Sequence, residues 1–411
     1  MTRQPQYDRH LVGWMSLAQL ITWGSVFYLF ALLMAPVEHD LGLSRAQSSL
    51  AFSLAMLAEG LVAYTVGRWI DRGHERVIMA GGSALVGLCL ILLSLVTHMT
   101  AFYAAWIGLG VGMAATLYAP AFAVVTRRFP HDFRRAIITL TFLGGLASTV
   151  FIPLTSWLIA TLGWRQALWA LAALQWLVCM PLHITLLRDA PRPVPAAPAT
   201  PDLQPASAGV QGTSSPLSQH LLSAPFLLIG VFVVLMMAVT VALPAHMVSL
   251  LRENGLDEAW VIAIPASIGA IQVLGRVLLY YFEHHVDLHL ANRLIPCLIP
   301  LGLAALLVAP TLGTAQLGMV MLFVLLFGMG NGMLTIVKGT AVAEYVNRDH
   351  VASLNGALGM PLALARAAAP LAMGLLWSPQ AGYRYGLWML LGMSASAIAV
   401  LVLAQRLSRR L

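Results

Sequence analysis

The sequence predicts an all-α integral membrane protein with twelve transmembrane helices, arranged as two pseudo-symmetric halves of six helices. Three observations predict this class: a composition too apolar for a soluble protein, twelve apolar runs, and a proline-rich segment near the middle of the chain. Of the 411 residues, 59% are hydrophobic and 9% are charged, and the mean hydropathy is +0.82. A soluble domain carries about 25% charged residues, so this chain could not cover a water-facing surface.

Each apolar run is long enough to form a helix that crosses the hydrocarbon core, which takes about 20 residues. The first six spans are expected at residues 12–37, 46–67, 77–97, 101–126, 136–162 and 165–187. The second six are expected at residues 221–250, 258–282, 290–310, 315–345, 352–378 and 383–405. Between them, residues 189–220 hold seven prolines among Ala, Ser and Gly, a composition that cannot build a core. We therefore expect an N-terminal half over residues 1–188, a disordered cytoplasmic linker over 189–220 and a C-terminal half over 221–411.

Arginine is distributed unevenly between the two sides of this topology. If the N-terminus is cytoplasmic, sixteen arginines fall in inside links and tails, and four fall in outside links, namely Arg45, Arg165, Arg252 and Arg384. Basic residues are retained on the cytoplasmic side of membrane proteins. We therefore expect both termini in the cytoplasm and the protein in a bacterial inner membrane. These links also explain the net charge of +7 without a nucleic-acid-binding face.

Two short segments recur between the two sets of spans. GLGVGM at residues 108–113 recurs as GMGNGM at 328–333, at an offset of 220. GWR at residues 163–165 recurs as GYR at 382–384, at an offset of 219. Parallel repeats of this kind occur in secondary transporters, where two halves rock around a site at mid-membrane.

The link between the second and third spans is the densest charged segment of the chain. It reads GRWIDRGHER over residues 67–76, with the pattern Gly-Arg-x-x-Asp-Arg-x-x-x-Arg. With the two-fold repeat, it resembles the major facilitator superfamily (MFS) of secondary transporters, and this resemblance covers essentially the whole chain. It implies a cytoplasmic latch in which the aspartate meets the positive N-terminal end of helix 11, near Ser353 here. The residues expected in the latch are Gly67, Arg68, Asp71, Arg72, Arg76 and Arg134. The alternative is that the arginines only follow the positive-inside distribution.

Three other segments are similar to the monocarboxylate-transporter and oxalate/formate-antiporter branch of that family. They are TWGSVFYLF in the first span, YAPAFAVVTRRF at the end of the fourth, and the region from Gly144 to Arg165. In that branch, basic residues of helices 8 and 11 hold substrate carboxylates, and the matching positions here are Arg276 and Arg366. The helix 1 lysine of many monocarboxylate transporters is absent here, as is the acidic residue that accompanies the helix 8 arginine.

Four ionisable side chains stand out inside the predicted spans: Glu59, Arg276, Lys338 and Arg366. A charge at mid-bilayer costs about 2.5 kcal/mol or more, so each should have a partner or a task. Lys338 is the only lysine of the chain, and its compact, titratable ammonium is expected to bind substrate or to couple transport. The alternative is that Lys338 extends to the cytoplasmic surface.

Glu59 and Arg366 both lie near mid-depth, and helices 2 and 11 abut in the family that the chain resembles. The two residues are expected to form an ion pair between the halves, either as a structural contact or as a gate that an anion breaks by competing for Arg366. Glu59 is also the mid-membrane carboxylate available for proton coupling. Arg276 lies late in the eighth span, where substrate binding and anchoring at the interface both remain open.

Helices 1, 4, 7 and 10 line the central cavity in this family. The resemblance therefore places Tyr118 opposite Lys338, and it places Trp23 and Tyr28 on the wall of the cavity. With three cations against one acid in the spans, the cavity is expected to be net positive. It would then favour a small organic anion, whose carboxylate arginine can hold through two hydrogen bonds.

We therefore expect a secondary active transporter that moves a small carboxylate-type anion by alternating access. A proton-coupled multidrug efflux antiporter is the alternative on the same fold, and a sensor that no longer transports is a third reading. An enzyme is not expected, because no nucleophile elbow, HExxH motif or phosphate-binding loop occurs in the sequence. No cofactor, bound metal or nucleic-acid partner is expected. The expected partners are the substrate, membrane lipid and protons, and the protein is expected to be a monomer.

Overall fold

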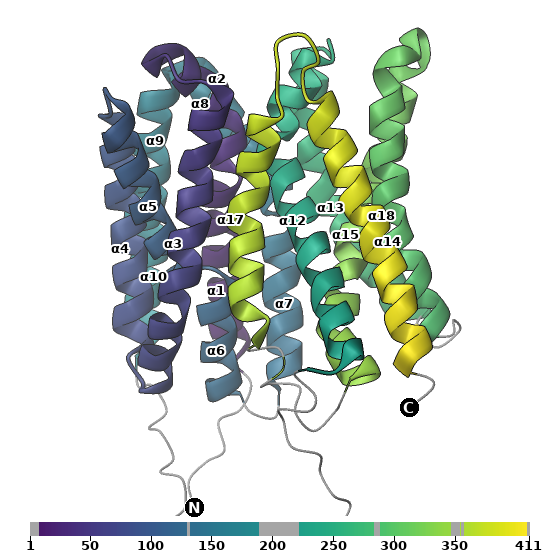
Figure 1. Ribbon diagram of the computed structural model, residues 1–411. Coiled ribbons are helices and arrows are strands. Elements are labelled where there is room, and N and C mark those ends of the chain that lie inside the picture. Colours follow the sequence, from purple (N-terminus) through teal and green to yellow (C-terminus); the bar gives the residue numbers. More distant parts are fainter. Residues whose placement is uncertain are drawn as a thin grey trace, which may run out of the picture.

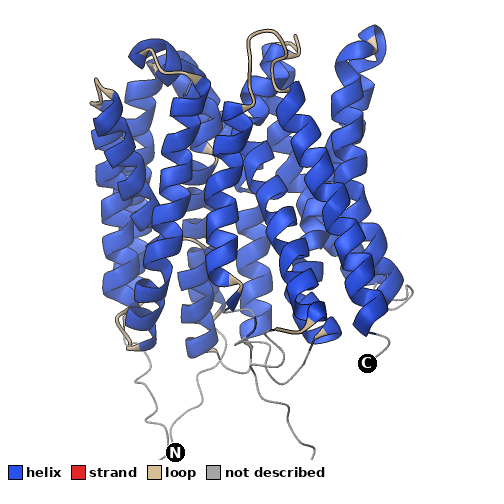
Figure 2. Cartoon of the chain, in the orientation of Figure 1, coloured by secondary structure: helices blue, strands red, loops and turns tan. Residues whose placement is uncertain are grey.

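The computed structural model describes residues 8–129, 132–188, 222–282, 288–346, 354 and 357–408. These residues form a bundle of helices, and no strand occurs in this part of the chain (Figure 2). Eleven helical segments are long and apolar enough to cross a membrane, and the shorter apolar helix Gly359–Leu375 adds a twelfth among the described residues. The predicted all-α membrane fold is therefore confirmed.

The first six spans are formed by elements that lie between residues 9 and 186. They are α1 (Arg9–Thr22), η1 (Trp23–Phe27), α2 (Leu29–Leu41), α3 (Arg45–Asp71), α4 (Glu75–Ser94), α5 (Met99–Thr116), α6 (Tyr118–Arg128), α7 (Phe133–Gly145), α8 (Ala147–Leu162), α9 (Trp164–Leu174), η2 (Gln175–Cys179) and α10 (Met180–Leu186). The turn between α2 and α3 shows how local sequence sets a boundary. Gly42 ends α2 in a left-handed conformation, and Ser44 and Gln47 form a reciprocal capping box at the start of α3.

The second six spans are more regular. They are α12 (Ala224–Glu253), α13 (Glu258–Phe282), α14 (Leu288–Val308), α15 (Gln316–Tyr345), α17 (Gly359–Leu375) and α18 (Arg384–Ser408). Two short 3₁₀ turns, η3 (Ala309–Thr311) and η4 (Gly313–Ala315), connect α14 to α15. The predicted start of helix 11 near Ser353 lies outside the described residues, and α17 begins at Gly359.

Several spans that the sequence predicts as continuous helices are interrupted. The fourth span is broken at Leu117, whose extended backbone (φ −76°, ψ −162°) separates α5 from α6. The fifth is divided at Leu146. The first and sixth each contain a π-helical turn, η1 and η2. These irregularities change which side chains face the same way, because each residue of a regular α-helix turns by about 100°.

Buried side chains form two large clusters, one drawn mainly from each set of helices. Phe232, Phe323 and Phe327 are fully buried in the cluster of the second set. Glycines bring helix backbones into close contact: a Cβ on Gly110 would overlap the Ala55 backbone of α3, and one on Gly332 would overlap the Gln272 backbone of α13. Small residues drive helix association in lipid in this way, since close packing replaces the hydrophobic effect.

The two sets meet mainly along three helix pairs, α3 with α17, α8 with α13, and α2 with α12, and α7 also contacts α13. The first of these pairs lies at the front of the bundle in Figure 1. We name the two ends of the bundle by their arginines: the Arg68 end, where α1 begins and α18 ends, and the Arg45 end, where α3 and α18 begin and α12 ends. The predicted linker, residues 189–220, lies outside the described residues, so the domain boundaries at 188 and 221 stay predictions.

Candidate functional site

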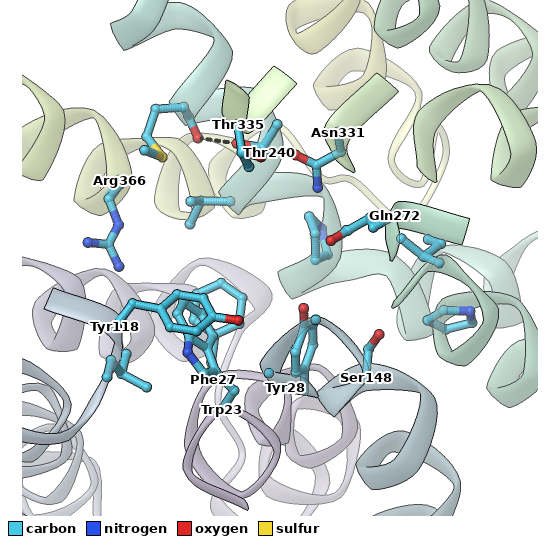
Figure 3. Close-up of a pocket in the computed structure, with 18 of the residues that line it drawn as sticks. Trp23, Phe27, Tyr28, Tyr118, Ser148, Thr240, Gln272, Asn331, Thr335 and Arg366 are labelled. Atoms are coloured by element: carbon cyan, nitrogen blue, oxygen red, sulfur yellow. Dashed lines mark hydrogen bonds between the residues drawn. The ribbon is translucent and has the colours of Figure 1, made fainter. Parts of the chain in front are cut away.

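A cavity of about 450 Å³ lies between the two sets of helices. The first set contributes η1, α3, α6, α7 and α8 to its wall, and the second contributes α12, α13, α15 and α17. Most of these residues lie near the middle of their spans, so the cavity is at mid-depth in the bundle. Figure 3 shows side chains from the two sets facing each other across it.

Five aromatic rings give the first set's side of the cavity its character. They are Trp23, Phe27, Tyr28, Tyr118 and Phe122, and Figure 3 shows four of them along one wall. Their rings touch in sequence: Tyr118 stacks on Phe122 with centroids 5.2 Å apart, Trp23 lies 4.9 Å from Tyr118, and Phe27 lies 5.0 Å from Trp23. The π turn η1 and the break at Leu117 place these rings together.

Polar and cationic side chains line the opposite wall. Gln272 and Arg276 come from α13, and Asn331, Thr335 and Lys338 come from α15. The Arg276 guanidinium donates hydrogen bonds to the Thr141 carbonyl at 3.0 Å and to the Gly332 carbonyl at 3.3 Å. The first of these bonds joins α13 to α7, so Arg276 both lines the cavity and connects the two sets.

The predicted ion pair between Glu59 and Arg366 is confirmed. The Arg366 guanidinium donates to both carboxylate oxygens of Glu59, with N–O distances of 2.7 and 3.1 Å. The two side chains are 12% and 21% exposed and join α3 to α17. Such a two-pronged contact is a strong charge-assisted interaction.

The ion pair decides the charge of the cavity. Glu59 is the one carboxylate among the described residues that line it, and Arg366 already neutralises it. Lys338 and Arg276 remain, and no carboxylate among the lining residues faces them. Counted by formal charge, the described residues that line the cavity are therefore net positive, in agreement with the count made from the sequence.

The six residues predicted to bind substrate all line this one cavity, together with Glu59: Trp23, Tyr28, Tyr118, Arg276, Lys338 and Arg366. Their roles stay predictions. The sequence did not single out Phe27, Phe122 and Gln272, although each lies four residues from a predicted residue. Since positions i and i+4 share a helix face, this spacing could have found them. Ser148 and Asn331 do not lie four residues from a predicted site residue, so this spacing would not have identified them.

The predicted latch residues Gly67, Arg68, Asp71, Arg72 and Arg76 lie at the Arg68 end, where Asp71 is exposed. The segment near Ser353 and the side chain of Arg134 are not described, so the latch stays a prediction.

The structure places another carboxylate of the same segment in an ion cluster. Glu75 is fully buried and pairs with Arg128 at 2.5 Å and with Arg127 at 3.5 Å. Arg127 also donates to the carbonyl of Ile70. Glu75 was not predicted from the sequence, because a carboxylate inside an arginine-rich link is expected to be solvated. The cluster ties α4 to α6 within the first set.

The chain matches the sequence profile of the Major Facilitator Superfamily over residues 15–334. It is also similar to the Multidrug resistance protein MdtL of Shigella flexneri serotype 5b (strain 8401) and of Escherichia coli (strain K12), at 30% identity over 200 residues in both cases. These alignments cover 47% of this chain and 48% of each relative. The chain thus spans about half the length of the curated relatives that it matches.

Two solved structures share the fold over nearly the whole chain. A bacterial homolog of the human lysosomal transporter Spinster, in an inward-facing and occupied conformation, has a TM-score of 0.72 at 15% identity and covers 97% of this chain and 96% of its own. The nucleoside transporter NupG has a TM-score of 0.68 at 14% identity, with coverages of 96% and 98%. Because the family profile matches most of the sequence and the architecture agrees, the chain belongs to the Major Facilitator Superfamily.

Proposed function

We propose that this protein is a secondary transporter of the multidrug type, which exports amphipathic aromatic compounds and prefers anionic ones to cationic ones. The observation that carries the proposal is the division of the cavity into an aromatic wall and a cationic, amide-bearing wall. The similarity to MdtL proteins supports the multidrug class and export as the direction.

The size and lining of the cavity fit a drug-sized molecule. Ligand cavities for such molecules measure about 300–1,000 Å³ and are largely apolar, with a few placed polar groups. This one measures about 450 Å³, and Met237 and Met247 add flexible apolar surface beside the rings. Aromatic and methionine surfaces adapt to different ligand shapes, which suits a transporter of several compounds.

Lys338 and Arg276 supply the preference for anions. A lipophilic cation would face two positive charges, and the one carboxylate that could attract it is held by Arg366. An aromatic carboxylate would instead place its ring against Trp23 or Tyr118 and its charge toward Lys338.

Glu59 is the residue that we assign to proton coupling. Its carboxylate lines the cavity and is paired with Arg366, and this ion pair joins α3 to α17. A proton on Glu59 would cancel its charge and weaken this contact. Proton binding and release would then change how firmly the two sets of helices are held together.

A small non-aromatic carboxylate is the second candidate substrate. Lys338 and Arg276 favour it, as does the resemblance to the monocarboxylate and oxalate/formate branch. This candidate does not require the five rings of the opposite wall, and the two candidates therefore differ in what the rings contribute.

Transport into proteoliposomes with an imposed pH gradient tests both candidates. The panel contains an aromatic carboxylate, its methyl ester, an aromatic amine of the same size, and a small aliphatic carboxylate. We expect the aromatic carboxylate to be transported fastest, the ester more slowly and the amine slowest. Fastest transport of the amine would contradict the charge preference, and transport of the aliphatic carboxylate alone would establish the second candidate. The variant Glu59→Gln should lose the dependence on the pH gradient.

A further inference from the structure

A second cluster of charged and aromatic side chains lies at the Arg45 end, apart from the cavity. The Arg45 guanidinium contacts Glu38 and Glu253, each at 3.0 Å, and it donates to the Tyr383 hydroxyl. It also lies over the ring of Trp377, 4.9 Å from the ring centroid. We call Glu38, Arg45, Glu253, Trp377 and Tyr383 the Arg45 cluster.

The cluster joins the two sets of helices. Glu38 and Arg45 belong to α2 and α3, whereas Glu253 ends α12, and Trp377 and Tyr383 lie in the link between α17 and α18. The side chain of Arg45 is 11% exposed and that of Glu38 is 13% exposed, so these charges are largely removed from solvent. Without Arg45, Glu38 and Glu253 would repel each other across the contact between the sets.

Two other arginines at this end make contacts within their own set. Arg165 donates to the carbonyls of Ser94 and Val96, and Arg252 pairs with Glu258. Arg45, in contrast, connects the two sets of helices.

A hydrogen-bond chain runs from Arg45 to the helix that carries Arg366. The Tyr383 hydroxyl lies 3.1 Å from Nδ1 of the buried His246, and Nε2 of His246 lies 2.9 Å from the Pro370 carbonyl in α17. Arg45 can only donate and a carbonyl can only accept. A neutral His246 therefore donates from Nε2 to Pro370 and accepts from Tyr383 at Nδ1. Pro370 lies four residues, about one helical turn, after Arg366.

We propose that the Arg45 cluster is the outer gate of the transporter, closed in this structure, and that His246 connects the gate to α17. The gate is outer because the distribution of arginines predicts that the Arg45 end faces outside. The inference rests on membership of a transporter family and on that predicted orientation, and it does not depend on the substrate. His246 and Tyr383 act as positioning residues: they tie the gate to the helix whose Arg366 pairs with Glu59.

Chemical labelling of a cavity cysteine tests the gate. Cys89, Cys179 and Cys297 are replaced by alanine, and Thr240→Cys on the cavity wall serves as the reporter. Right-side-out vesicles are treated with a membrane-impermeant maleimide. Arg45→Gln should raise the labelling rate about tenfold, since loss of the contacts shifts the population toward an outside-open state. The labelling rate of Arg45→Lys should lie between the rate of the parent protein and that of Arg45→Gln. Arg252→Gln is the matched control and should change the rate by less than about twofold, because its ion pair lies within one set.

The same labelling from the inside separates a gate from a general loss of structure. In inside-out vesicles, Arg45→Gln should lower the labelling rate, since opening one side closes the other. A variant that merely loosens the fold would raise labelling from both sides, and that result would overturn the proposal. An unchanged outside rate in Arg45→Gln would also overturn it.

The connection through His246 has its own test. His246→Gln should raise outside labelling several-fold, and it should add nothing further in the Arg45→Gln background, because both act on one contact. If the two effects multiplied, His246 would act independently of Arg45 and the connection would be refuted. None of these outcomes depends on transport of a compound, so failure of the substrate proposal would leave the gate proposal intact.

Discussion

The two walls of the cavity differ in kind although they come from repeated halves of one fold. Among the described lining residues, the wall from the first set offers five aromatic rings and one carboxylate, and the wall from the second set offers three cations and two amides. In the proposed function, the rings would bind by contact area and tolerate many shapes. The cations would bind by charge and discriminate between ligands. The difference teaches that breadth of substrate and selection by charge can be supplied by separate helices, and the ion pair Glu59–Arg366 is one of the contacts that join the two walls.

The largest effect on stability is expected at the ion pair between Glu59 and Arg366. Arg366→Ala leaves Glu59 without its partner, and breaking a largely buried ion pair in this way costs about 3 kcal/mol. We expect a clear fall in the melting temperature of the purified protein, measured by thermal unfolding in detergent. The double variant Glu59→Gln with Arg366→Gln should recover most of that loss, because neither charge is then left alone. No recovery in the double variant would mean that Arg366 stabilises the bundle through packing.

The second effect concerns charge on the second set's wall. Lys338→Gln should raise KM for an aromatic carboxylate about tenfold, which corresponds to about 1.4 kcal/mol of lost binding. It should leave KM for the methyl ester within about twofold, as measured by transport in proteoliposomes. Thr335→Val, on the same helix and without a change of charge, is the matched control. An equal change for acid and ester would show that Lys338 acts on the fold and not on ligand charge.

The third effect concerns the aromatic wall. Trp23→Ala removes a ring that contacts both Phe27 and Tyr118. It should raise KM about three- to tenfold for acid, ester and amine alike, because a stacking contact contributes about 0.5–1.5 kcal/mol and is indifferent to ligand charge. Trp23→Phe should retain most of the affinity in the same assay. A loss confined to the carboxylate would contradict the division of labour between the walls.

The smallest effect is expected from the amides. Gln272→Leu should raise KM about threefold for compounds that carry a second polar group, and it should have no effect on compounds without one. A neutral hydrogen bond contributes about 0.5–1.5 kcal/mol. Transport competition assays with pairs of compounds that differ by one hydroxyl group measure the contribution of this hydrogen bond. If both members of each pair responded equally, Gln272 would contribute shape and not a hydrogen bond.

Charged residues inside the spans explain why much of the site could be predicted. Each one is costly in a membrane, so each carries information, and the prediction that Glu59 meets Arg366 is confirmed by their contacts. The order and number of the spans follow from apolar run length alone. The rings were harder to place, because a span that is apolar on all sides gives no sign of which face lines a cavity.

The repeat in the sequence does not predict which helix faces correspond between the two halves. Gly112 approaches Val86 of α4, the third span of its half, whereas Gly332, its partner at an offset of 220, approaches Gln272 of α13, the second span of its half. The offset of 220 therefore aligns similar residue types, but it does not align equivalent faces of the helices. Tyr118 and Lys338 both line the cavity, but they are not equivalent positions of the two halves. The Arg45 cluster could not be predicted either, since Glu38, Arg45 and Glu253 lie near the ends of spans, where a charge costs little and is expected to be solvated.

The π turn η1 has a consequence for the whole first span. The Tyr28 N–H bonds to the Trp23 carbonyl, five residues back, so this turn holds one residue more than an α-helical turn. Conversion of the turn to α-helix would rotate α2 by about 100° and shift it by about 1.5 Å relative to α1. Glu38 would then leave Arg45, while Trp23 stayed in place. One surplus residue thus sets the angle about the helix axis between Trp23 on the cavity wall and Glu38 in the Arg45 cluster.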